Sequence, residues 1–144
     1  MNRFTNKTVL ITGGSSGMGF AAAWRLLDEG AYVVITGRDQ GRLDSAVARL
    51  NAAERALAVR ADVSSLADLD HLMRRVETWR GGLDAVFANA GVGIFKPAAE
   101  ITEADFVHTV DVNVKLNYLQ PADALAAFTR GKVDAWAVWD PYTS

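Results

Sequence analysis

Cysteine is absent from the 144 residues, which excludes disulfide bonds and thiolate metal sites. Clusters of lysine and arginine are absent too, and the net charge is −2, so a nucleic-acid partner is not expected. No apolar run is long enough to span a bilayer. The residues before the first apolar run lack the apolar region of an export signal, so we expect no membrane contact and a cytoplasmic location.

The composition is that of an ordinary globular protein, with 50% hydrophobic and 22% charged residues in a length that suits a single domain. Short apolar runs alternate with helical patterns, which is typical of an α/β fold. We predict one Rossmann-like domain over residues 1–144, a three-layer sandwich around a parallel sheet in the order 3-2-1-4-5. The predicted strands cover residues 9–11, 32–36, 57–61, 83–88 and 133–139.

Two of the predicted helices show their buried side as an apolar stripe. The helix after the first strand carries Phe20, Trp24 and Leu27 along one stripe. The helix that begins after Ser65 carries a longer one, and Ser65 with Asp68 forms its capping box. Its inward residues are predicted to be Leu66, Leu69, Met73 and Val76.

A glycine-rich loop connects the first strand to the first helix. It contains Gly13, Gly17 and Gly19 in the spacing Gly-x-x-x-Gly-x-Gly. A strand, a glycine loop and a helix aim backbone N–H groups and the positive helix end at a phosphate. An ordinary βα turn rich in glycine is the alternative. We predict cofactor binding by the loop residues Gly13, Ser15, Ser16, Gly17, Met18 and Gly19.

The second strand ends beside Arg38, about 20 residues beyond the loop glycines, where dinucleotide folds contact the adenosine ribose. An acid at this place would bind the 2′-hydroxyl, whereas the planar, permanently charged guanidinium suits a 2′-phosphate. A solvated loop arginine is the alternative. Asp39 comes one residue late and is expected to cap the next helix instead.

Three further elements complete the pattern. Asp62-Val63 ends the third strand, Asn89-Ala90-Gly91 ends the fourth, and Asn113 lies in a later helix. In this order, with Thr12 before the glycine loop, they resemble the short-chain dehydrogenase/reductase family. The resemblance runs to about Lys115. It implies an oxidoreductase fold that binds NADP, with NAD less favoured, through Arg38, Asp62, Val63, Asn89, Ala90 and Gly91.

The resemblance also gives Asn113 a catalytic role, holding a water-linked proton path; otherwise a polar residue there is solvent-facing or marks a kink. The rest of that family's catalytic set is missing. No Tyr-x-x-x-Lys occurs, because Tyr32 has Thr36 and Tyr118 has Ala122 four residues later. We therefore expect no catalysis, since a developing alkoxide needs a proton source. We expect no metal site.

Residues 116–144 resemble a different family, the periplasmic solute-binding proteins for aliphatic sulfonates and taurine. The resemblance rests on Pro121-Ala122-Asp123-Ala124 and on the run from Ala127 to Pro141 with Trp136 and Trp139 in it. It implies a chimera or gene fusion, in which a helix and a strand replace the missing half of the dehydrogenase fold.

Three functions compete at this point. The chain is an NADP-binding domain without catalysis, an active oxidoreductase using other groups such as Asp140, or a fusion product with no selected ligand. We also expect a homodimer through residues 133–139, because an edge strand that carries tryptophans offers unpaired backbone groups and apolar surface to a second copy.

Overall fold

A computed structural model describes residues 2–114 and 135–138, and for the second range only the backbone. Its strands are β1 (Thr8–Thr12), β2 (Tyr32–Gly37), β3 (Ala56–Arg60), β4 (Ala85–Ala88) and β5 (Ala135–Val138). Its helices are α1 (Gly17–Asp28), α2 (Gln40–Leu50), α3 (Leu66–Arg80), the short 3₁₀ helix η1 (Ala98–Glu100) and α4 (Glu103–Val114).

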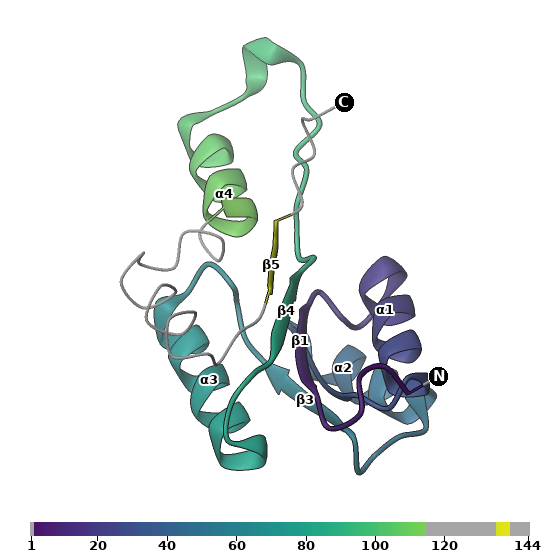
Figure 1. The fold of residues 1–144 in the computed structure, drawn as a ribbon. Helices are drawn as coiled ribbons and strands as arrows, with labels where there is room; N and C mark the ends of the chain where they lie inside the picture. The colour runs from purple at the N-terminus through teal and green to yellow at the C-terminus, as the bar shows by residue number, and fades with distance from the viewer. Residues whose placement is uncertain (1, 115–134, 139–144) are drawn as a thin grey trace.

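The five strands form one parallel sheet in the order β3-β2-β1-β4-β5 (Figure 1). This confirms the predicted strand order and the α/β class. The predicted fifth strand, 133–139, is present as Ala135–Val138 and pairs in parallel with β4. The tryptophan side chains and the chain on either side of β5 lie outside the described residues. The fourth strand begins at Ala85, two residues later than predicted.

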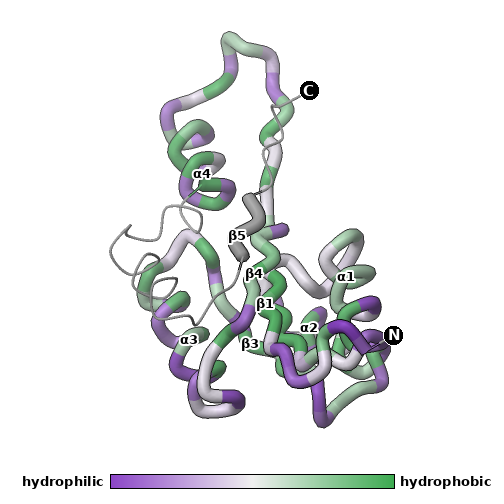
Figure 2. The backbone as a smooth tube through the Cα atoms, in the orientation of Figure 1, coloured by the Kyte–Doolittle hydropathy of each residue, from purple (hydrophilic) through white to green (hydrophobic). Residues whose placement is uncertain are grey.

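Alternate side chains of the central strands point to opposite faces of the sheet, and each face has its own core. Val9, Ile11, Val33 and Ile35 pack with residues of α1 and α2. Leu10 and Val34 lie on the other face, with residues of α3 and with Val112 of α4. The central strands are therefore buried on both sides, and Figure 2 shows β1 and its neighbours as the apolar middle of the molecule.

The helix stripes match the prediction in part. In α1 the buried residues are Gly19, Ala23 and Leu27, while Trp24 is 54% exposed. In α3 they are Leu69, Leu72 and Val76. The predicted inward residues Leu66 and Met73 are exposed instead. At Gly19 the helix passes so close to the glycine loop that a Cβ would stand 2.5 Å from the carbonyl oxygen of Gly13.

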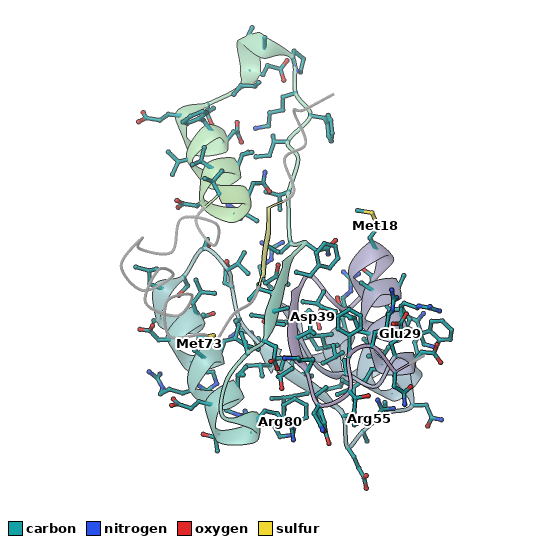
Figure 3. All side chains as sticks on the ribbon, in the orientation of Figure 1. Met18, Glu29, Asp39, Arg55, Met73 and Arg80 are labelled. Atoms are coloured by element: carbon teal, nitrogen blue, oxygen red, sulfur yellow. The ribbon has the colours of Figure 1, made fainter. Side chains whose placement is uncertain are left out.

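Glu29 is a buried acid at the C-terminal end of α1, far from the ends of the strands where the glycine loop lies (Figure 3). Its carboxylate pairs with the guanidinium groups of Arg3 and Arg25, the latter at 2.7 Å. The hydrogen bond from Arg3 is the main reason that the pKa of Glu29 falls from 4.5 to about 2. The pair with Arg3 connects the N-terminal segment to the first helix, while the pair with Arg25 lies within the end of that helix.

We expect Glu29→Gln to lower the free energy of unfolding at neutral pH, because it removes the charge that both arginines bind. A lowered folded-state pKa stabilises above the unfolded value, and this stabilisation is lost as pH falls from 4.5 to about 2. Urea unfolding at several pH values should show a constant difference from wild type above pH 4.5 that shrinks below it. Glu54→Gln, at an exposed residue, is the control; a difference that did not change with pH would contradict the assignment.

Candidate functional site

The glycine loop is fastened to the end of the neighbouring strand. Gly13 has a φ of +66°, and its N–H donates to the carbonyl of Thr36 at 2.9 Å. The N–H of Gly14 donates to the same carbonyl at 3.3 Å. A left-handed residue at position 13 lets the chain leave β1 and turn across β2, and glycine adopts this conformation without strain.

The same loop lies against the first turn of α1 and against the loop after β4. A Cβ on Gly19 would stand 2.5 Å from the carbonyl oxygen of Gly13 and 2.6 Å from the amide nitrogen of Asn89. A Cβ on Gly13 would stand 3.1 Å from the Cα of Ala90. The three segments are close enough to touch only because both positions lack a side chain, so the cradle around the N-terminus of α1 is backbone.

The N-terminus of α1 is not capped by a side chain. Ser16 is its N-cap residue, yet the hydroxyl makes no capping bond and the first turn has no acid. The other three α-helices described have caps: Asp39 accepts from Arg42 at 3.0 Å, Ser65 from Asp68 at 3.3 Å, and Thr102 from Asp105 at 3.2 Å. The first N–H groups of α1 therefore have room for an external anion, at the positive end of the helix dipole.

Asn89 and Thr12 join the ends of β4 and β1. The hydroxyl of Thr12, which is fully buried, accepts the N–H groups of Asn89 at 3.0 Å and of Ala90 at 2.9 Å. The side-chain amide of Asn89 donates to the carbonyls of Thr12 at 3.0 Å and of Gly13 at 3.3 Å. The predicted site residue Asn89 thus has a structural role here, and sequence analysis assigned no role to its partner Thr12.

Asp62 stands at the end of β3 as an ionised acid. Hydrogen bonds from the hydroxyl of Ser64 at 2.6 Å and from its N–H at 2.9 Å are the main reason that the pKa of Asp62 is lowered. The charges of Arg38 and His108 lower this pKa further, so both groups lie within electrostatic reach of the carboxylate. Val63, the other predicted residue of this pair, is buried in the core beside α3.

The remaining predicted residues divide into exposed and anchored ones. Arg38 is exposed beyond β2, and its carbonyl accepts a hydrogen bond from the Nε of Arg60 at 3.1 Å. Met18 is 70% exposed and projects from the tip of α1 (Figure 3). Asn113 is anchored, because its amide accepts from the N–H of Val92 at 2.8 Å and donates to the carbonyl of Val92 at 2.9 Å.

These contacts place Asn113 against the loop that leaves β4. A Cβ on Gly91 would lie 3.1 Å from its Oδ1, so the Asn-Ala-Gly loop and α4 are held at close range by one side chain. The glycine loop and residues 38, 62 and 89 all follow the C-terminal ends of parallel strands, where open α/β sheets bind ligands.

Two kinds of site are not found in the part of the chain that the structure describes. No group of three histidine, aspartate or glutamate residues there is arranged to hold a metal ion. Within residues 2–114 and 135–138, no helix has the length and apolar character needed to cross a membrane.

We expect the two glycines at the start of α1 to respond differently to substitution. Gly17 has a φ of +56° and open space around its Cβ position, so Gly17→Ala should cost about 1 kcal/mol and Gly17→Asn less, because asparagine tolerates this conformation. Gly19→Ala should cost about 2 kcal/mol through overpacking, and Gly19→Asn more. Urea unfolding of the four variants tests this; a Gly19→Asn variant as stable as Gly19→Ala would refute the close contact.

Comparison with known proteins agrees with this geometry. The family described as short chain dehydrogenase matches residues 7–132. The match continues past residue 115, where the sequence analysis ended this resemblance, into the segment that resembled solute-binding proteins. Most of that segment lies outside the described residues, and its second resemblance stays a prediction.

The chain is also similar in sequence to individual oxidoreductases. The chain is 44% identical over 133 residues to the oxidoreductase asL5 of Sarocladium schorii, covering 91% of this chain and 53% of that protein. It is 35% identical to galactitol 2-dehydrogenase of Agrobacterium fabrum, over 78% of this chain and 43% of the relative. The chain thus spans about half the length of the curated relatives that it matches.

Among solved structures, a 3-ketoacyl-(acyl-carrier-protein) reductase from Brucella melitensis, complexed with NADH, superimposes with a TM-score of 0.78 at 32% identity. The superposition covers 89% of this chain and 54% of the reductase. The fold, the loop at the end of β1 and the family match lead to one conclusion: the chain belongs to the short-chain dehydrogenase family.

Proposed function

We propose that this chain binds a nicotinamide dinucleotide across the C-terminal ends of its strands and prefers NADP(H) to NAD(H). The observation that carries the proposal is the N-terminus of α1, which has neither a side-chain cap nor an acid in its first turn and faces a cradle of backbone. An anion is the natural occupant of such a helix end. A related reductase is complexed with NADH, which supports a dinucleotide as that anion.

The residues present fit such a cofactor. The loop of Gly13 to Gly19 would hold its pyrophosphate, and Arg38 would hold a 2′-phosphate. Asp39 does not compete for the ribose, because its carboxylate caps α2 through the N–H of Arg42. The remaining predicted contacts, Asp62, Val63, Asn89, Ala90 and Gly91, would border the cofactor at the ends of β3 and β4, on either side of the glycine loop.

When bound, the cofactor would supply a hydride donor or acceptor. This chain's own residues would bind and orient it, and their positions are set by the hydrogen bonds of Thr12 and Asn113. The Tyr-x-x-x-Lys motif, which the family resemblance implies as the proton donor and its partner, does not occur in the 144 residues. We therefore propose that these residues bind the dinucleotide without catalysing its reaction.

Two other functions keep some support. Membership of an oxidoreductase family favours an active enzyme that uses other groups, such as Asp140, which lies outside the described residues. A fusion product without a selected ligand follows from the second resemblance of residues 116–144. The homodimer through residues 133–139 also stays a prediction, which light scattering would check.

The cofactor preference is tested with Arg38→Ala. We expect NADPH binding to weaken by roughly 10- to 150-fold, since a charge-assisted hydrogen bond contributes about 1.5–3 kcal/mol, and NADH binding to change little. Fluorescence titration of both cofactors measures this, with Arg74→Ala on the exposed side of α3 as a control. Equal losses for the two cofactors would show that Arg38 does not contact the 2′-phosphate.

Catalysis is tested separately with the purified 144-residue protein. We expect no oxidation of NADPH by ketone substrates above background, because the developing alkoxide has no proton donor. The absorbance of NADPH follows the reaction. Turnover that is abolished by Asn113→Ala or by Asp140→Ala would overturn this expectation.

A further inference from the structure

A second concave site lies outside the cofactor crevice, along the outer edge of the sheet. It is a pocket of about 460 Å³ between β3, the start of α2 and the first turns of α3. The residues that line it are Gln40, Ala58, Val59, Arg60, Asp68, His71 and Arg75. None of the residues assigned to dinucleotide binding lines this pocket.

The floor of the pocket is an open strand edge. β3 stands at the end of the sheet, with β2 on its only paired side among the described strands. The carbonyl of Arg55 and the N–H of Ala61 bond to β2, so the odd-numbered residues of this stretch face β2. The N–H groups of Ala58 and Arg60 therefore point to the other side, where the pocket lies.

Two arginines and a histidine stand in the walls of the pocket. His71 and Arg75 are one helical turn apart on α3 and both exposed, and Arg60 stands opposite them on β3. Neither arginine forms an ion pair with an acid of the described residues. Arg60 donates only through its Nε, to the carbonyl of Arg38 at 3.1 Å, so its two terminal nitrogens remain for other acceptors.

One carboxylate, that of Asp68, also lines the pocket, and each of its oxygens accepts one hydrogen bond from the chain. One accepts the N–H of Asp62 at 2.9 Å and the other the hydroxyl of Ser65 at 3.3 Å. The amide of Gln40 likewise donates to Asp44 at 2.7 Å. The groups left over in the pocket include the guanidinium donors of Arg60 and Arg75 and the outward N–H groups of Ala58 and Arg60, beside the outward carbonyls of the same two residues.

We propose that this pocket binds a phosphate group through Arg60, Arg75, His71 and the outward N–H groups of β3. Guanidinium groups match the geometry of phosphate oxygens with paired hydrogen bonds, and backbone N–H groups supplement them. Two sources of the phosphate are distinguished by the test. The first is the 2′-phosphate of the dinucleotide, because Arg60 lies against the backbone of Arg38. The second is a separate compound that carries a phosphate group.

The test is a titration of inorganic phosphate at low ionic strength, followed in two-dimensional amide NMR spectra. We expect saturable shifts at residues 58–60, 71 and 75, and affinity about tenfold lower in Arg60→Gln and in Arg75→Gln. Arg74→Gln, which removes the same charge one residue outside the pocket, should bind as wild type does. Absent shifts, or an equal loss in Arg74→Gln, would overturn the proposal.

The source is identified by repeating the titration with saturating cofactor. Loss of phosphate binding with NADPH but not with NADH assigns the pocket to the 2′-phosphate, an outcome that rests on the proposed function. Binding that persists with both assigns it to a separate phosphate compound, and holds even where dinucleotide binding fails. Loss with both cofactors would place the phosphate at the glycine loop and overturn the pocket.

Discussion

The contact between the ends of β1 and β4 is the constraint on which the rest of the site depends. The buried hydroxyl of Thr12 accepts two backbone N–H groups, and the amide of Asn89 returns two hydrogen bonds to the same turn. A buried N–H that loses its acceptor costs about 1–3 kcal/mol. This junction therefore fixes the loop after β4 against the glycine loop, and glycine at 13 and 19 leaves the space for it.

The N-termini of the helices differ in whether a side chain of the protein caps them. Three helix N-termini are satisfied by Asp39, Ser65 and Thr102, so their positive ends are neutralised inside the chain. Among the α-helices of residues 2–114, the first one, beside the glycine loop, is the one whose N-terminal donors have no side-chain cap. Arg38 follows β2 and Arg60 ends β3, and the Nε of Arg60 donates to the carbonyl of Arg38. The carboxylate of Asp62 follows β3, and the charge of Arg38 contributes to lowering its pKa.

The C-terminal ends of the strands carry a helix end without a side-chain cap, a backbone cradle and an exposed arginine. The described residues also include the side chain of Asn113, which the family resemblance places near the proton path, yet that amide is bonded on both sides to the backbone of Val92. These bonds hold α4 against the loop after β4.

The sequence by itself determined the class, the strand order and the places where the strands end, because buried parallel strands and glycine turns leave patterns in a single chain. It also identified the caps at Asp39 and Ser65, which depend on residues three positions apart. It placed Trp24, Leu66 and Met73 inward, and the structure exposes all three. A period of 3.6 residues shows that a stripe exists, but not which side of the helix meets the sheet.

Only the tertiary structure decided how distant segments share one contact. Thr12 and Asn89 are 77 residues apart, and Arg60 and Arg38 are 22 apart, so no local pattern relates them. The same holds for the pocket beside β3, whose lining comes from three elements that the sheet brings together. The role of such a side chain depends on a hydrogen bond to a residue far away in the sequence. That bond forms only in the folded chain, so the sequence pattern around either residue does not predict it.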